Sequence, residues 1–414
     1  MGLLKTNKIF TIVCLILFST TVMAQSEQDA IEYRRSSLYQ LMIGHMKQEF
    51  ASEIKQTFLH LSMPEQYNDH NLSVRVIETV RKVDDVKKNR ENDSITAFLE
   101  KNHIASRLVA RWFNRDMENG VCDMSLIKER GLYNANEFDR QMAMQSVRGM
   151  SLLEDAGEDL INNTFVVVND IQYIDKNKTA RIAGAVTYAL AATASVAMRN
   201  DSFKNMGESI VNMTNEIDGF RVKINSFLYR LVWNDTIANN FYTNHYTSTP
   251  DETKARAFED ARENYRLEYV GKVESSGGTT SFYGIAKERR DLMLLKALQR
   301  AIDENIADLQ QNFEVFRVKT PLVSTDPLTA YIGLKEGMTD KSRYEVLEVV
   351  QKENGKISYK RVGVIAPEVG KIWDNRCMAD LEKAENSDLN CTTFKVISGK
   401  NFCSGMLIRE ISGN

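Results

Sequence analysis

The sequence is poor in the residues that stiffen or cross-link a chain, since its 414 residues include only five prolines and five cysteines. So few prolines exclude a rigid proline-rich linker. No two cysteines have the CxxC spacing of a redox centre. The formal net charge is only −3, which excludes a strong overall attraction to nucleic acid or to anionic lipid.

The motifs of the common enzyme families are also missing. The chain has no HExxH metal-binding pair, no GxSxG nucleophile, no Walker loop and no GxGxxG dinucleotide loop. The adjacent carboxylates Asp84-Asp85 and Glu158-Asp159 are acid/base candidates, but neighbouring residues rarely converge on one substrate, which favours solvated surface. None of the histidines belongs to a recognisable metal-binding motif; they are His45, His60, His70, His103 and His245. The sequence therefore predicts no catalytic residue, no metal site and no cofactor.

The first residues have the layout of a secretory signal peptide. Lys5 and Lys8 lead into the apolar run Ile9–Phe18, and small and polar residues follow up to Ala24. This apolar run is too short to span a bilayer. We expect cleavage after Ala24 and export to a bacterial envelope, either to the periplasm or to the outer membrane.

The remaining residues, about 390, have room for two or three domains. The changes of hydrophobic period along them predict an α+β fold. We expect a mainly helical N-terminal region over 25–125, a central α/β domain with a mixed sheet over 126–320, and a small β-barrel over 321–414. The best boundary before the barrel is Pro321–Pro327, where two prolines lie close together.

Apolar residues at three- and four-residue steps predict the helices. One is expected over residues 29–62, with Leu38, Leu41 and Met42 on its apolar face. The others are expected over residues 93–113, 136–153, 251–263 and 288–313. The last is the most regular, because its apolar residues form one continuous stripe.

Two strands are expected at the centre of the chain, over Thr164–Tyr173 and Gly219–Trp233. The second alternates apolar and polar residues, and the phase of the alternation changes at Ser226–Phe227, which predicts a bulge or a bend. A further strand is expected over Arg266–Glu274, followed by a flexible loop at Ser275–Thr280.

An alanine-rich segment, residues 179–198, separates the two central strands. It is expected to be a helix with small residues that permit close packing. One interpretation packs it against the sheet. The other exposes it to a membrane or to an identical subunit, with an interface formed by Ala185, Ala189, Ala192 and Val196.

A short strand is expected over Glu314–Lys319, before the boundary, and the last ninety residues contain two hairpin signals. One hairpin turns at Asn354-Gly355 and the other at Gly399-Lys400. The second turn would set Val396 opposite Cys403. An oxidising compartment favours disulfides, and we expect either one bridge between Cys377 and one of the other two barrel cysteines or only free thiols; the three are Cys377, Cys391 and Cys403.

Several segments from Leu126 onward resemble periplasmic curli-secretion and flagellar-assembly proteins. The resemblance lies in LIKERG (126–131), AGEDLINNTFVV (156–167), ALQRAIDENIADL (297–309) and GLKEGMTDKSRYEVLE (333–348). It implies a location in the envelope and a small terminal barrel. The alanine-rich segment departs from the β-hairpin that curli channels place between these strands, so a pore role does not follow.

These observations favour a non-enzymatic envelope scaffold or assembly protein. Its expected partners are other envelope proteins or a second copy of the chain, with membrane contact through 179–198 and no nucleic acid. One alternative is an exported hydrolase with dispersed carboxylates. The other is a module that binds glycans or peptides on aromatic side chains; the candidates are Phe241, Tyr242, Tyr246 and Tyr269.

Overall fold

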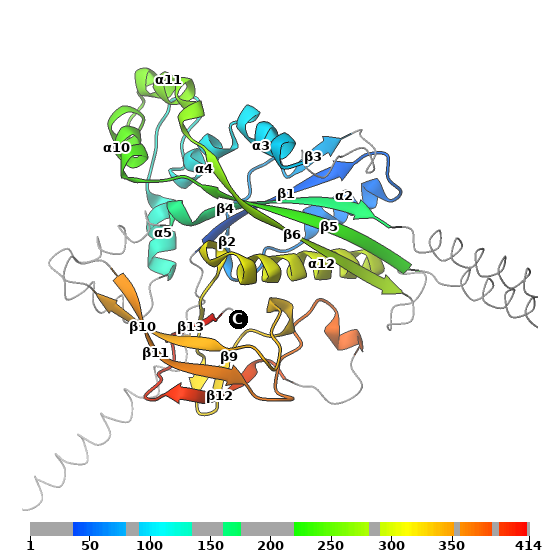
Figure 1. The fold of residues 1–414 in the computed structure, drawn as a ribbon. Helices are drawn as coiled ribbons and strands as arrows, with labels where there is room; N and C mark the ends of the chain where they lie inside the picture. The colour runs from blue at the N-terminus through cyan, green and yellow to red at the C-terminus, as the bar shows by residue number, and fades with distance from the viewer. Residues whose placement is uncertain are drawn as a thin grey trace, which may run out of the picture.

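The computed structural model describes residues 36–79, 91–134, 160–174, 219–280, 290–351, 357–382 and 389–411. These residues form an α+β fold with two sheets, one above the other in Figure 1. The predicted signal peptide, the alanine-rich segment 179–198 and both adjacent carboxylate pairs lie outside the described residues. No helix within the described ranges has the length and apolar character that crossing a membrane requires.

The upper sheet is mixed, as the sequence predicted. Its strand order is β2-β1-β4-β5-β6, and β3 also pairs with β1. β1 runs parallel to β2, β3 and β4, whereas β5 runs antiparallel to both of its neighbours, β4 and β6. The strands are β1 (Ser36–His45), β2 (Tyr67–Asp69), β3 (Val76–Thr79), β4 (Thr164–Tyr173), β5 (Gly219–Leu231) and β6 (Leu267–Thr280).

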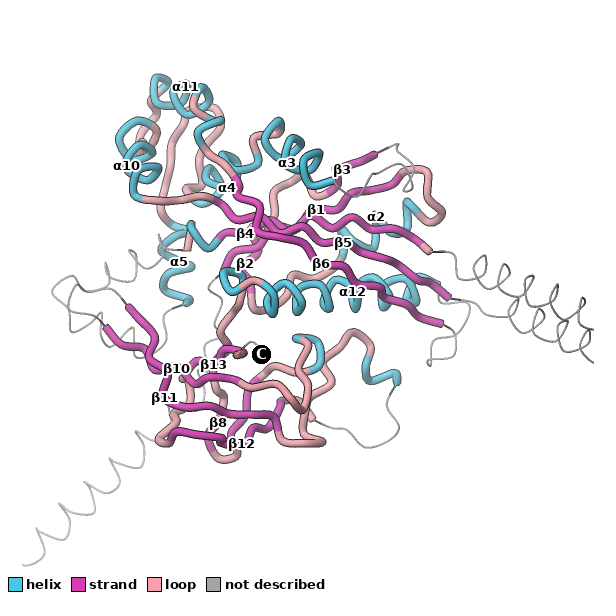
Figure 2. Tube along the Cα trace, viewed as in Figure 1, coloured by secondary structure: helices cyan, strands magenta, loops and turns pink. Residues whose placement is uncertain are grey.

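Helices cover both faces of this sheet, as the tube view in Figure 2 shows. The apolar cluster on one face includes residues of α2 (Ala51–His60) and α12 (Arg290–Asn312). The cluster on the other face includes residues of α3 (Glu91–Lys101), α4 (Ile104–Trp112), α5 (Ser125–Asn134), α10 (Asp235–Asn244) and α11 (Glu252–Asp260). The sheet is therefore the middle of three layers.

α12 confirms the predicted apolar stripe. Leu298, Ile302 and Leu309 are buried in the cluster beneath the upper sheet. The helix also contacts the backbone of β6 at Gly277, where an added Cβ would lie 2.0 Å from the carbonyl oxygen of Ala297. Gly277 therefore serves close packing, and the segment Ser275–Thr280 is the end of β6 instead of the flexible loop we expected.

The change of phase in β5 has a simpler cause than a bend. Phe220, Val222 and Ile224 face the cluster of α2 and α12, and Phe227, Tyr229 and Leu231 face the opposite cluster. The side chains of β5 alternate between the two faces of the sheet along the whole strand. The face that packs against the second cluster is buried only from Phe227 onward. A register shift does occur nearby, between Leu228 and Tyr229, where β6 has one extra residue.

The helix predicted over residues 29–62 is wrong in its first half. Leu38, Leu41 and Met42 belong to β1, which is buried on both faces, and the helix α2 starts only at Ala51. A strand buried on both faces is apolar at nearly every position, so helical spacing appears in it by chance. The helix predicted over 93–113 is divided into α3 and α4 at His103, whose φ is 49°.

The lower sheet has the order β7-β13-β10-β11-β12-β9-β8. The first predicted hairpin is confirmed, because β10 and β11 pair antiparallel. The second is wrong: β12 pairs with β11 and β9, while β13 pairs with β10 and β7. The strands are β7 (Thr320–Pro321), β8 (Ser324–Thr325), β9 (Leu328–Ala330), β10 (Tyr344–Gln351), β11 (Ile357–Pro367), β12 (Thr392–Gly399) and β13 (Leu407–Glu410).

The expected barrel is present in part, because the lower sheet curls as a partial barrel but does not close among the described residues. β7 and β8 end the strand order and do not pair with each other among the described residues. The short strand expected over Glu314–Lys319 is also absent, since Glu314–Phe316 is a 3-10 turn. The other short helical turns are Ile161–Asn163, Arg262–Asn264, Leu334–Glu336 and Ala379–Glu382.

α12 lies between the two sheets, and its lower side meets the lower unit through polar contacts (Figure 1). The Arg300 guanidinium donates a 3.0 Å hydrogen bond to the carbonyl of Cys377. Beside it, the carboxyl of Asp303 is buried and accepts a 2.8 Å hydrogen bond from Gln299. Burial raises the pKa of Asp303 to about 6, because the charged form loses its hydration.

Candidate functional site

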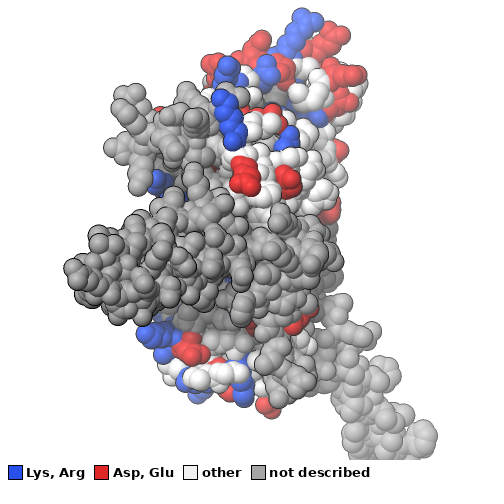
Figure 3. Space-filling model, turned by 90° about the vertical axis from the view of Figure 1, so that its right-hand side faces the viewer, with Lys and Arg blue, Asp and Glu red and all other residues white. Residues whose placement is uncertain are grey.

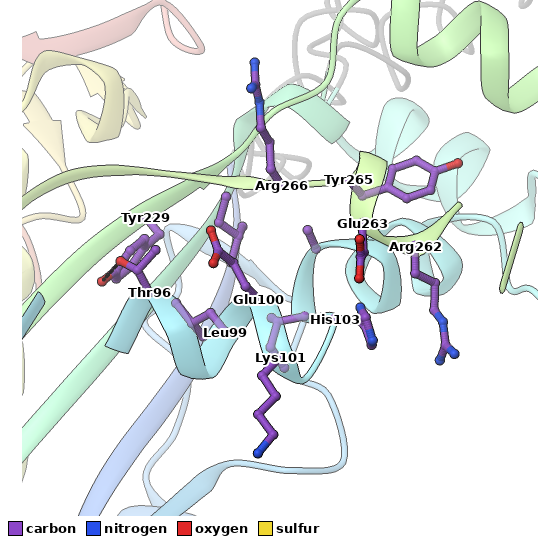
Figure 4. A pocket seen from close by; sticks show the side chains of 13 residues that line it. Thr96, Leu99, Glu100, Lys101, His103, Tyr229, Arg262, Glu263, Tyr265 and Arg266 are labelled. Atoms are coloured by element: carbon purple, nitrogen blue, oxygen red, sulfur yellow. Dashed lines mark hydrogen bonds between the residues drawn. The ribbon is translucent and has the colours of Figure 1, made fainter. Parts of the chain in front are cut away.

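A cavity of about 510 Å³ opens where α3 meets α4, opposite the 3-10 turn Arg262–Asn264 and the start of β6 (Figure 4). Its floor is apolar and includes Leu99, Ile104 and Leu267. Its rim is charged, with both signs present; the charged residues are Glu100, Lys101, Arg262, Glu263 and Arg266. An apolar floor with a few polar groups is the usual composition of a ligand pocket.

The chain creates this cavity by breaking a helix. His103 adopts the left-handed conformation between α3 and α4, which few residues other than glycine and asparagine do readily. The break turns the end of α3 toward the 3-10 turn Arg262–Asn264. Figure 4 shows Glu263 directed toward this junction, while Lys101 and Arg266 point away from it.

Tyr229 lines the pocket at its β-sheet end, and Tyr269 packs against it from outside the lining. The Tyr229 and Thr96 hydroxyls are 3.2 Å apart, and the Tyr229 ring lies 5.3 Å from that of Tyr269. Burial raises the pKa of Tyr229 to about 12, so its hydroxyl stays protonated at neutral pH. This end of the pocket offers hydroxyl groups beside an aromatic surface, which suits a ligand with one flat face and several hydroxyl or amide groups.

Three of the four aromatic candidates are used inside the protein. Phe241 is fully buried, and Tyr242 and Tyr246 pack with it around Phe113. Only Tyr269 is exposed, at 37% of its surface. Phe241, Tyr242 and Tyr246 therefore serve packing, and Tyr269, beside Tyr229, is the candidate whose ring a ligand can reach.

Two buried arginines hold the fold together. Arg130 donates hydrogen bonds to His70 Nδ1 at 2.8 Å and to the Asp69 carbonyl at 2.7 Å, and it stacks on Trp112. Because His70 also donates from Nε2 to the Leu108 carbonyl, its imidazole is neutral, and burial holds its pKa well below the usual value. The contacts of Arg130 are therefore structural.

The second arginine, Arg115, closes the loop after α4 in the same way. Its guanidinium donates to the carbonyls of Gly120 and His245, at 2.8 and 3.1 Å, and lies over the ring of Phe258. Cys122 is buried beside it.

A histidine and a carboxylate meet on the upper sheet. Nε2 of His45, at the end of β1, bonds to Asp170 of β4, and both side chains are buried. Gln172 donates to the other oxygen of Asp170 at 2.9 Å. No group of three or more His, Cys, Asp or Glu within the described ranges is arranged to hold a metal ion.

Neither the scan of protein-family models nor the search of curated proteins finds a match for this chain. The resemblance to curli-secretion and flagellar-assembly proteins therefore stays a prediction. Any function proposed for the chain rests on the geometry of its own residues.

The four cysteines of the described ranges are free thiols in the structure. The predicted pairing of Val396 with Cys403 is wrong, because Val396 lies opposite Ile365. A bridge among Cys377, Cys391 and Cys403 therefore has no support from strand pairing. The proposed interface residues Ala185, Ala189, Ala192 and Val196 lie outside the described residues.

A second and wider groove, of about 860 Å³, lies between the end of α12 and the lower sheet. Its lining includes four basic side chains and one acidic side chain, that of Glu410. The basic residues are Arg317, Lys341, Arg343 and Arg361. By contrast, the described residues on the face in Figure 3 show acidic and basic side chains intermingled.

The sequence did not indicate this groove. Its basic residues come from separate stretches of the chain, so no local charge run marks them. The pocket at α3–α4 was equally hidden, because Glu100 and Glu263 are far apart in sequence and only the helix break at His103 makes room between them.

Proposed function

We propose that the chain is a non-enzymatic interaction protein of the bacterial cell envelope, exported by cleavage after Ala24, that scaffolds or assembles other proteins. One observation carries this proposal. The groove of about 860 Å³ between the end of α12 and the lower sheet is open and borders the sheet edge at Ile397 and Ser398, a shape that fits a segment of another protein better than an enclosed small molecule.

The buried polar groups support the same function. Arg130 bonds to His70 and to a backbone carbonyl, and Arg115 bonds to two backbone carbonyls. These hydrogen bonds stabilise the fold, and few of the donors of these side chains are left for a substrate. A scaffold needs a rigid frame beneath an accessible surface, and these networks provide the frame.

Site-specific photo-crosslinking in the native cell tests this function. A photoreactive phenylalanine analogue is placed at Ile397 in the groove, at Tyr269 beside the pocket, and at Glu252 on α11 as a control. We expect an adduct with another protein from Ile397 and none from Glu252. Adducts from none of the three positions, or hydrolysis of peptide or glycan substrates by the purified protein, would reject the proposal.

A second candidate function is a glycan- or peptide-binding module, which Tyr229 in the pocket and the partly exposed Tyr269 beside it favour. Tyr269→Ala should then weaken binding of such a ligand and leave the fold intact, because the ring is partly exposed. Glycan-array binding by the purified protein, compared with this variant, checks that function.

Self-association or membrane contact through residues 179–198 is also part of the proposal. Ala189→Glu should leave the monomer folded while it abolishes oligomers or co-sedimentation with vesicles. If the segment is core, the same change unfolds the domain, because an unpaired buried carboxylate is unfavourable. Circular dichroism and light scattering distinguish the two.

A further inference from the structure

The strand β12 has an unpaired edge. On one side it pairs with β11 from Phe394 to Gly399, but on the other side β9 reaches only Thr392 and Thr393. Within the described ranges no segment pairs with the outer edge from Phe394 to Gly399. These six residues span roughly 20 Å at the usual rise of a strand. β12 lies along the bottom of the molecule in Figure 1, where a partner has access.

Two aliphatic side chains are exposed on this edge. Val396 exposes 52% of its surface and Ile397 exposes 50%. The pairing with β11 skips Ile397, so the strand has a bulge there. An exposed edge with adjacent aliphatic residues is a template for strand addition.

The charges around the edge select the partner. Ile397 and Ser398 line the same groove as Arg343 and Arg361, and Lys395 and Lys400 are exposed at the two sides of the aliphatic pair. Two copies of such an edge would bring lysines together, and like charges oppose pairing. An acidic strand would meet the opposite sign at each of these positions.

We infer that this edge and groove bind an extended, acidic segment of a partner protein, which adds to β12 as a strand and places its carboxylates against Arg343 and Arg361. Backbone hydrogen bonds to Phe394–Gly399 hold the segment, and the aliphatic pair Val396 and Ile397 contacts its apolar side chains. The inference rests on the proposed function and adds the chemistry of the partner.

The test measures binding of fluorescein-labelled peptides to the purified protein by fluorescence anisotropy. The probe is an eight-residue peptide with alternating glutamate and valine. One comparison peptide replaces glutamate with lysine, and another carries N-methyl groups on alternate residues of the acidic sequence. N-methylation removes the backbone donors on one edge and leaves the charges unchanged.

We expect the acidic peptide to bind, and the lysine and N-methylated peptides to bind at least roughly tenfold more weakly. The double change Arg343→Glu with Arg361→Glu should weaken the acidic peptide by a similar factor, and added salt should weaken it in the wild-type protein. The matched control Arg256→Glu, on exposed α11 at the far end of the molecule, should bind as the wild type does. Circular dichroism confirms that both variants are folded.

Four results would overturn the inference. They are no binding of the acidic peptide, equal binding of its N-methylated form, dimers of the protein that Ile397→Glu dissociates, and binding to phosphatidylglycerol vesicles without binding to the peptide. If crosslinks from Ile397 are found although the peptide does not bind, the partner chemistry is wrong and the proposed function stands. If both fail, the proposed function fails as well.

Discussion

Replacing Asp303 by asparagine should make the protein more stable at neutral pH. The carboxyl is buried between α12 and the lower unit, and its pKa rises from 3.8 to about 6. A raised pKa means that the folded state binds the proton more tightly than the unfolded state does. The protonated group therefore stabilises the fold fully below pH 3.8, and this stabilisation is lost as the pH rises through 6.

The size of the effect can be worked from the shift. About two pKa units correspond to roughly 3 kcal/mol at 1.36 kcal/mol for each unit. Asparagine keeps the shape and the hydrogen bond to Gln299 but carries no charge, so it should recover up to about 3 kcal/mol at pH 8. Between pH 8 and pH 5 the advantage of the variant should shrink by about 1.4 kcal/mol, because the wild-type carboxyl becomes protonated.

Urea unfolding at pH 5 and pH 8, followed by tryptophan fluorescence, measures these differences. Asp260→Asn, an exposed carboxylate on α11, is the matched control and should change stability little at either pH. An advantage of Asp303→Asn that is equal at the two pH values, or a loss of stability at pH 8, would refute the reasoning.

Three further predictions concern the frame and the export of the chain. Gly277→Ala should destabilise the upper sheet by about 1–3 kcal/mol, because its Cβ collides with the Ala297 carbonyl, whereas Ser276→Ala at the neighbouring exposed position should be nearly neutral; urea unfolding compares them. Arg130→Met should destabilise by about 2–5 kcal/mol, since it leaves His70 and the Asp69 carbonyl without their donor, and thermal unfolding that matches the wild type would show that Arg130 is dispensable. Sequencing of the secreted protein should give Gln25 as the first residue, and a retained Met1 would reject the signal peptide.

The sequence predicted elements well wherever one face of the element is buried. The stripe of α12 follows from its period alone. β1 failed because it is covered on both faces, so Leu38, Leu41 and Met42 show neither period cleanly. β5 was predicted correctly as a strand, and its apparent change of phase arises because one face is covered only from Phe227 onward.

The candidate sites could not be predicted from local sequence patterns, because strand pairing between distant segments forms them. The second hairpin failed because a glycine turn signals a reversal of the chain but does not say which strand the returning segment joins. Leu407–Glu410 crosses to β10, and this crossing leaves the edge of β12 open. The basic groove depends on the same crossing, since Glu410 and Arg343 come together only there.

The parallel pairing of β1 with β4 also determines when the upper sheet forms. The two strands join segments far apart in the chain, and 125 residues separate His45 from Asp170. The segments that form several helices are therefore synthesised after β1 and before β4, the strand with which β1 pairs at the centre of the sheet. Closing so large a loop is entropically unfavourable, and sheets rich in such contacts fold slowly. The nascent chain consequently lacks a finished core for much of its synthesis, which is the condition in which a translocation channel accepts a polypeptide as an unfolded thread.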